Sequence, residues 1–344
     1  MWQGCGRHPW HAYNPSASSP MIRPRSLIIL AVLLTSLGVF YALAGWPLSG
    51  GDSKDKQATG VEDATRAPVL ASRAPSADPS PAVSDGCAPP SDPSFLSANQ
   101  IVAYYGSPYA AQLGILGQHT PDELASMLKD QASKLDALNG FRGVQPAFDI
   151  IYETAQSSPG NDGLYLQYVD NETMKQYTDL ACKDHFFIFL DLQIGRSDVA
   201  TEVNKVLPFL RGSNVHIALD PEFTMQQGEV PGQAIGHMDA SQINAAQQIM
   251  ESFVEQNGLP DKILVVHEFD APMITNPDQI QIFPHVQLVI DMDGFGPKET
   301  KIKKFGWYAQ PAQHSGIKIF FQQDDPVMTE EEVEALNPDL IIYQ

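Results

Sequence analysis

Two carboxylic acids stand one residue apart at the end of an otherwise apolar stretch of the sequence. The stretch, residues 215–223, reads VHIALDPEF, and its acids are Asp220 and Glu222. Side chains two apart in an extended chain point the same way, and Pro221 favours an extended backbone at Asp220. Neighbouring carboxyl groups repel each other's charge, so one tends to keep its proton while the other ionises. Such a pair suits general acid–base catalysis.

Polar side chains also follow other apolar runs of the chain. They are Asp191 and Gln193, His267 and Glu268, Asp291 and Asp293, and Gln322. If these runs are parallel strands of one barrel, their carboxyl ends meet at one rim and the side chains gather there. The alternative interpretation is that each acid caps a helix or accepts hydrogen bonds from loop amides.

The spacing of the apolar runs indicates the fold. Eight β-branched or aromatic runs follow Gln100 and alternate with segments of helical period. They cover residues 101–105, 147–152, 186–191, 215–220, 263–267, 287–291, 317–321 and 340–343. Capping-box patterns begin at Thr120, Asp239 and Thr329. Eight strands, buried on both faces and joined by crossovers, predict an α/β fold, a (β/α)8 barrel of the TIM type, over residues 98–344.

Two features predict that this barrel is incomplete or decorated. Gln344 directly follows the eighth strand, so we expect no helix after it, and the fifth crossover, around residues 276–281, is short. The first strand is followed by no Gly-x-Gly-x-x-Gly pattern, which argues against a dinucleotide-binding fold. The sequence therefore predicts no cofactor.

In such a barrel the active site lies at the C-terminal ends of the strands. We predict that Glu222 donates a proton and that Asp220 or Asp291 acts as nucleophile or base. The predicted supporting residues are Asp191, His267, Glu268, Asp293, Gln193 and Gln322, and the predicted aromatic faces for a substrate ring are Tyr104, Tyr105, Phe223 and Phe295. The three catalytic carboxyl groups should then meet in one open cleft, with a pair about 5 to 9 Å apart.

This arrangement resembles that of exported glycosidase-like barrels. In the chitinase-like family the fourth strand ends in Asp-x-Asp-x-Glu; Asp220 and Glu222 match its last two acids, while Ala218 stands at the first. In the large retaining clan with catalytic glutamates after strands four and seven, Glu222 matches the acid/base. Strand seven of this chain offers Gln322 and Gln323 in place of the second glutamate.

A third group, the α-galactosidase-like clan, uses aspartates after strands four and six. Asp220 and either Asp291 or Asp293 are similar in position, although their flanking residues differ from that clan's patterns. The resemblance to these barrels implies a hydrolase that acts on glycosidic bonds of envelope or extracellular carbohydrate.

Two other functions stay open. A metal-dependent hydrolase could draw its ligands from Asp191, Asp220, Asp291 and His267, although His216, His237, His267 and His285 show neither His-x-His nor His-Glu-x-x-His spacing. A non-catalytic barrel could instead bind a glycan or another protein with its rim. A serine nucleophile is disfavoured because the sequence contains no Gly-x-Ser-x-Gly elbow.

The charge of the chain bears on its partners. The sequence carries 41 acidic and 21 basic residues, a formal net charge of −20. A phosphate backbone would be repelled, so we predict no nucleic-acid partner. The predicted partner is carbohydrate or another envelope ligand, and the oligomeric state is open.

The N-terminal residues predict export. Residues 1–20 carry no periodic pattern and stand ahead of Met21, a possible true start; Arg23 and Arg25 then precede an apolar run over residues 27–46. Residues 21–46 are therefore predicted to be a signal peptide cleaved near Ala44 or an uncleaved single-pass anchor. The positive-inside rule sends the following residues across the membrane. The protein would then be secreted, or held on the outer face of the cytoplasmic membrane.

Residues 47–97 are predicted to be a disordered linker, because they are rich in Pro, Ser, Ala and Asp and poor in large apolar side chains. Cys87, in this linker, and Cys182 lie beyond the apolar run. In an oxidising compartment they could form a disulfide, and the alternative is two unpaired thiols.

Overall fold

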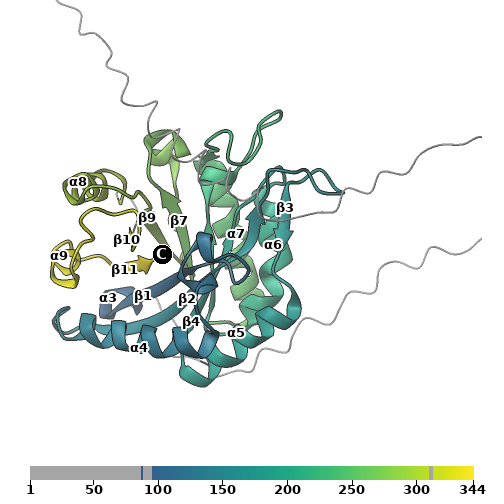
Figure 1. The fold of residues 1–344 in the computed structure, drawn as a ribbon. Coiled ribbons are helices and arrows are strands. Elements are labelled where there is room, and N and C mark those ends of the chain that lie inside the picture. Colours follow the sequence, from purple (N-terminus) through teal and green to yellow (C-terminus); the bar gives the residue numbers. More distant parts are fainter. Residues whose placement is uncertain (1–86, 88–94, 310–312) are drawn as a thin grey trace, which may run out of the picture. The chain divides into compact units, whose positions relative to one another are not determined.

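Eight parallel strands close into a barrel within the described part of the chain, which in this computed structural model is Cys87, residues 95–309 and residues 313–344 (Figure 1). They are β1 (Asn99–Gly106), β2 (Gly143–Ala155), β4 (Phe187–Leu192), β5 (Val215–Leu219), β7 (Lys262–Glu268), β9 (Val286–Met292), β10 (His314–Ile319) and β11 (Leu340–Tyr343). The order is β1, β11, β10, β9, β7, β5, β4, β2, and β2 pairs back with β1. The predicted (β/α)8 barrel is confirmed, and each predicted strand overlaps an observed one.

Helices connect most of the strands on the outside of the barrel (Figure 1). They are α4 (Pro121–Asp136), α5 (Asn171–Asp184), α6 (Val199–Val206), α7 (Ala240–Asn257), α8 (Lys298–Tyr308) and α9 (Glu330–Glu334). The short strand β3 (Leu166–Tyr168) pairs antiparallel with the end of β2, and β6 (Met238–Asp239) pairs with β8 (Ile274–Thr275).

Local sequence signals start three of these helices. Thr120, Asp239 and Thr329 each form the predicted capping box, in which the cap side chain accepts from the N3 amide and the N3 side chain accepts from the cap amide. Two otherwise unpaired amides at each helix start are thereby satisfied.

The fifth crossover, from β7 to β9, contains no α-helix and is covered by its neighbour α7. The side chains of Asn244 and Gln247 on α7 donate to the carbonyls of Gln279 and Gln281 at 2.9 and 3.0 Å. In return, the Gln281 amide donates to Asn244 Oδ1 at 2.8 Å. These bonds hold the helix-free crossover against α7.

Apolar side chains pack on both faces of the strands. A larger cluster fills the space between barrel and helices, and a smaller one, including Ile101, Phe189 and Val265, fills the lower part of the barrel interior. The helix α3 (Phe95–Ala98) closes the N-terminal end, where the rings of Phe95 and Phe187 lie 5.1 Å apart. The predicted domain boundary at residue 98 therefore lies within a packed helix.

The disulfide Cys87–Cys182 links Cys87, which precedes α3 in the sequence, to α5. It spans 95 positions of the sequence, and Cys87 is buried. The apolar run at residues 27–46 and most of the predicted linker lie outside the described residues. Within the described part, no helix has the length and hydrophobicity needed to cross a membrane.

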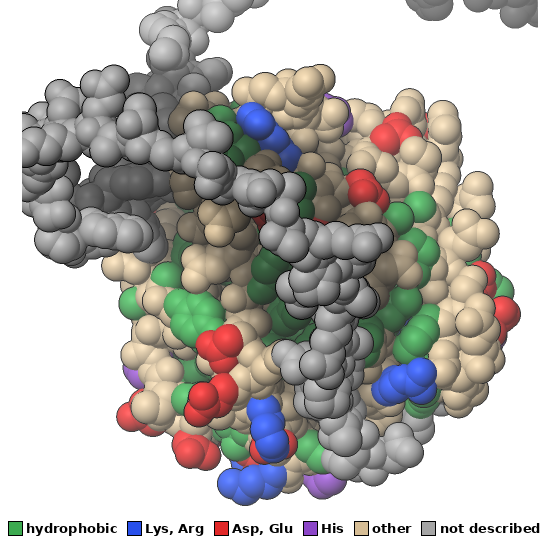
Figure 2. Space-filling view, turned by 90° about the vertical axis from the view of Figure 1, so that its right-hand side faces the viewer, with side chains coloured by type: hydrophobic (Ala, Val, Ile, Leu, Met, Phe, Trp, Pro, Cys, Tyr) green, Lys and Arg blue, Asp and Glu red, His purple; other side chains and the backbone are tan. Residues whose placement is uncertain are grey.

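Charged side chains of both signs lie on the face of the molecule that Figure 2 shows. On the face that Figure 2 shows, acidic, basic and hydrophobic side chains lie among one another rather than forming one extended basic surface. The absence of a nucleic-acid partner stays a prediction from the net charge.

Removing the disulfide should destabilise the barrel, because the cross-link restricts the unfolded chain over a long loop. We expect the Cys87→Ala/Cys182→Ala variant to lose about 2–5 kcal/mol of unfolding free energy. Urea denaturation followed by circular dichroism would measure the loss. A midpoint equal to that of the wild type would contradict the stabilising role of the bond.

Candidate functional site

Ionisable side chains line the upper part of the barrel interior, towards the C-terminal ends of the strands. We define the ionic layer as Tyr105, Asp149, Asp191, Asp220, His267, Asp291, Asp293 and Lys318. These residues come from β1, β2, β4, β7, β9 and β10 and from the positions directly after β5 and β9. Each is at most 9% exposed. Seven of the eight strands thus place a polar side chain, within the strand or directly after it, in one enclosed space.

Two cations hold part of the layer together. His267 Nδ1 lies 3.0 Å from Asp291 Oδ2 and 3.8 Å from Asp293 Oδ2. Lys318 Nζ lies 3.3 Å from Asp293 Oδ2 and 3.3 Å from the centroid of the Tyr105 ring. The Tyr105 hydroxyl donates to Asp191 Oδ2 at 2.7 Å. These contacts connect six of the eight residues of the layer, all except Asp149 and Asp220, into one network.

Burial and mutual repulsion shift the protonation of the acids. Burial, followed by the charge of Asp191, raises the pKa of Asp220 to about 7 and that of Asp149 well above its usual range. Burial lowers the pKa of His267, but the hydrogen bond to Asp291 and the nearby carboxylates outweigh it and raise that pKa to about 10. Near neutral pH the layer therefore combines protonated carboxyl groups with an imidazolium.

Several oxygens of the layer have no hydrogen-bond partner among the described residues. Both carboxyl oxygens of Asp149 and one of Asp220 are in this position. Because an ionised, unpaired carboxylate is costly to bury, these groups are better accommodated in their neutral form.

Glu222 lies at the rim in a turn rather than in a continued strand. The backbone is extended at Asp220, as the sequence predicts, but the 3-10 turn Pro221–Phe223 begins directly after it, so the extended geometry does not continue through Glu222. Glu222 still faces the layer and is partly exposed: burial, then the charges of Asp220 and Asp293, raise its pKa well above the usual range. A proton donor can therefore stand between solvent and the buried acids.

The loop that follows Glu222 folds back onto the turn. The Gly236 amide donates to the Glu222 carbonyl at 2.6 Å, and the His237 amide donates to the Thr224 carbonyl at 3.3 Å. A side chain at Gly236 would meet the Thr224 carbonyl oxygen at 2.4 Å, so this approach requires glycine. The long loop is thereby anchored at both of its ends.

The structure brings together most of the ionisable residues that the sequence predicts for the site. Asp191, Asp220, His267, Asp291 and Asp293 gather in the ionic layer. Their burial differs from the open cleft that the sequence predicts, since Asp220 is 3% exposed and Asp291 is fully buried.

Two of the aromatic predictions require correction. Tyr104 does not line the mouth; it packs between the barrel and the helices, and its hydroxyl donates to the Met127 carbonyl. Tyr105 does lie inside the barrel, but only 3% of it is exposed and Lys318 covers its ring, so it offers no face to a substrate. Phe223 is partly buried, and Phe295 is 40% exposed beside Phe320.

The remaining supporting residues occupy separate places. Gln193 accepts from the Ala155 amide at 2.9 Å and so joins the end of β4 to β2. Glu268 follows His267 in β7, which places it on the opposite face of the strand, where burial raises its pKa to about 8. Gln322 lies in the loop after β10.

Reasoning from strand ends missed Asp149 and Lys318. Both lie within a strand, in the runs AFDIIY and IKIFF, and both are buried in the barrel interior. The sequence signal that could have identified them is a charged residue inside an otherwise apolar strand.

A buried ion pair braces the loop after β10. Lys301 Nζ lies 3.1 Å from Asp324 Oδ2 and donates to the carbonyls of Gly294 and Lys318 at 2.6 Å each. Asp324 in turn accepts from the amides of Gly296 and Phe320 at 2.9 Å. The ends of β9 and β10 are fixed to each other at the rim.

The described residues contain no group of three or more His, Cys, Asp or Glu side chains arranged to hold a metal ion. The ligand set considered from the sequence, Asp191, Asp220, Asp291 and His267, is therefore not preformed as a metal centre.

No protein-family model matches the sequence, and no curated protein matches it. Solved structures that are similar include an oxaloacetate acetylhydrolase in complex with oxalate, with 12% identity, a TM-score of 0.41 and coverage of 73% of this chain and 78% of that one. A hyperthermophilic endo-β-1,4-glucanase is similar with 10% identity and a TM-score of 0.35, over 73% of this chain and 90% of that one. A sugar phosphate isomerase/epimerase from Parabacteroides distasonis is similar with 11% identity and a TM-score of 0.32, over 72% of this chain and 85% of that one. With TM-scores below 0.5, these likenesses carry no argument about function.

His267 should remain protonated well above neutral pH, because Asp291 and the other acids stabilise its charge. We expect its imidazole to titrate near pH 10 by NMR and the Asp291→Asn variant to titrate at much lower pH. Since the folded pKa exceeds the unfolded one, this pair stabilises the fold fully below about pH 6.5 and progressively less as pH rises through about 10.

The matched control is Asp261→Asn, which removes the partner of the more exposed His285, 2.8 Å away. This change should leave His267 unaltered. A His267 that titrates between pH 6 and 7 in the wild type would contradict the assigned network.

Proposed function

We propose that the protein is a hydrolase that cleaves a glycosidic bond by acid–base catalysis at the C-terminal mouth of the barrel. The observation that carries this proposal is the uneven distribution of cations among the acids. Asp291 and Asp293 contact His267 or Lys318, whereas neither Asp220 nor Glu222 forms an ion pair with any described residue. Positive charge therefore lies beside Asp291 and Asp293 and stabilises negative charge there more than at Asp220 and Glu222. Glycoside hydrolysis requires such a division between its two carboxyl groups.

Glu222 is the proton donor in this scheme. It is partly exposed at the rim, and its raised pKa keeps it protonated near neutral pH. Asp220 and Glu222 do not readily ionise together, because a negative charge on Asp220 makes ionisation of Glu222 less favourable.

Asp293 acts as nucleophile or base in this scheme. Of the acids in the ionic layer it is the most exposed, at 9%, and it lies near both Lys318 and His267. The sequence favours Asp220 or Asp291 for this role. Asp291 is fully buried against His267, and it therefore orients the imidazolium rather than meeting a substrate.

A second candidate function is binding without turnover. The observation that favours it is the burial of Asp191, Asp220 and Asp291, of which none is more than 3% exposed. In that case the ionic layer would be a structural feature, and the rim alone would contact a glycan.

Glu222→Gln tests the donor directly. We expect this variant to lose turnover by about 10²–10⁴-fold on any glycan that the wild type hydrolyses, because the amide has no acidic proton to give. A reducing-end assay over a panel of envelope and plant glycans would measure it. The wild-type rate should also fall at high pH as Glu222 loses its proton.

The matched control is Glu255→Gln, on the exposed surface near the end of α7, which should leave turnover unchanged. Full activity in Glu222→Gln would refute the donor assignment. Binding of a glycan by the wild type without any turnover would favour the second candidate function.

We also propose that the protein is exported, by the signal peptide or anchor predicted at residues 21–46. The Cys87–Cys182 disulfide supports this, because such bonds persist in oxidising compartments. We expect the full chain, expressed in a bacterial host, to fractionate with the envelope or the medium. N-terminal sequencing should find a start near Ala44 or an uncleaved segment, and a reduced cytoplasmic protein would contradict export.

A further inference from the structure

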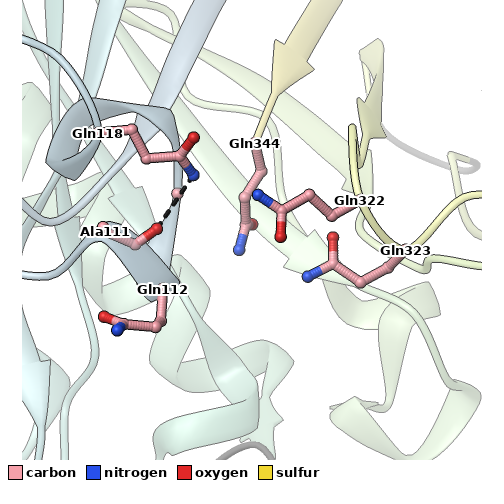
Figure 3. A pocket seen from close by; sticks show the side chains of 7 residues that line it. Ala111, Gln112, Gln118, Gln322, Gln323 and Gln344 are labelled. Carbon is pink, nitrogen blue, oxygen red and sulfur yellow. Dashed lines mark hydrogen bonds between the residues drawn. The ribbon is translucent and has the colours of Figure 1, made fainter.

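A small hollow at the mouth of the barrel is lined mainly by glutamines (Figure 3). Its lining residues are Ala111, Gln112, Gly114, Gln118, Gln322, Gln323 and Gln344. They come from three separate segments: the loop after β1, the loop after β10, and the residue after β11. The hollow therefore lies at the same end of the barrel as the ionic layer and Glu222.

The amides of this hollow are largely free to bind a ligand. Figure 3 shows Gln322 and Gln323 extending towards Gln344 from one side and Gln118 approaching from the other. Gln118 Nε2 donates to the Ala111 carbonyl at 3.0 Å, which leaves its side-chain oxygen available. The side chains of Gln112, Gln322, Gln323 and Gln344 form no hydrogen bond within the described part of the chain.

The backbone that carries these glutamines is fixed in place. Gly114 packs so closely on the end of β1 that a side chain there would meet the Tyr105 carbonyl oxygen at 2.4 Å. The Gln344 amide donates to the Ile319 carbonyl at 2.9 Å, and the Phe321 amide donates to the Gln344 carbonyl at 3.0 Å.

Gln322 and Gln323 stand in the loop that the Lys301–Asp324 pair braces. The free side chains thus project from an ordered frame, which reduces the conformational entropy lost when a ligand binds.

The chemistry of the lining identifies the class of ligand. A carboxamide both donates and accepts hydrogen bonds, as a hydroxyl group does, and no charged side chain lines the hollow. We propose that the glutamine side chains around this hollow form a hydrogen-bonding wall of a subsite for a neutral, hydroxyl-rich sugar unit of the glycan cleaved beside Glu222. This inference rests on the proposed function and adds that the substrate is uncharged, since a protein with a net charge of −20 would repel an anionic sugar.

The experiment measures binding by isothermal titration calorimetry on the full chain carrying Glu222→Gln, so that no turnover is needed. The probes are cellohexaose, maltohexaose and mannohexaose, with hexagalacturonate as the anionic comparison. The test variant adds Gln322→Leu and Gln344→Leu, and the matched control adds Gln248→Leu, an exposed glutamine on α7. Thermal unfolding confirms that each variant folds, and Gln323→Leu alone replaces the double change if it does not.

We expect at least one neutral hexamer to bind, hexagalacturonate not to bind, and the dissociation constant for the neutral hexamer to rise about tenfold in the double variant. The control should bind as the parent does. Failure of every neutral hexamer to bind, or equal binding by the double variant, overturns the subsite. If binding needs these glutamines but the wild type does not cleave the same hexamer, the proposed hydrolysis is refuted and the subsite stands, so the two failures are distinguishable.

Discussion

More carboxyl groups than cations are enclosed in the upper barrel, and this imbalance is the constraint on which the site depends. Five aspartates share the ionic layer with His267 and Lys318. Full ionisation would leave unpaired charge in a poorly hydrated space, at a cost of several kcal/mol for each unpaired ion. The layer therefore retains protons, and its protonation is a property of the whole network rather than of one residue. Burying these ionisable groups destabilises the folded state, and the apolar packing below the layer and outside the barrel offsets that free-energy cost.

The burial of both strand faces explains why the strands can be found from the sequence while their inward faces cannot. In a (β/α)8 barrel both faces of each strand are apolar, so the runs stand out but the alternation that separates inside from outside is lost. Tyr104 and Tyr105 are adjacent and equally buried, yet one packs under the helices and the other enters the ionic layer. Asp149 and Lys318 were missed for this reason, because their role depends on which face of the strand turns inward.

Residues beyond the strand ends are less predictable still. Asp220 continues the line of β5, as expected, whereas Glu222 sits in a 3-10 turn whose course depends on the returning loop. The glutamine hollow joins residues more than 200 positions apart, and barrel closure alone brings them together. The short fifth crossover was visible in the sequence, but its attachment to α7 through Asn244 and Gln247 was not.

The bond from the Gly236 amide to the Glu222 carbonyl links the position of the long loop to the charge of the site. A displacement of the loop that breaks this bond would release the backbone of Glu222, and better hydration of its carboxyl group would favour loss of the proton. Conversely, an ionised Glu222 would be drawn towards water and away from Asp220 and Asp293. Loop opening and proton release are therefore thermodynamically coupled, so that each shifts the equilibrium of the other by the same free energy.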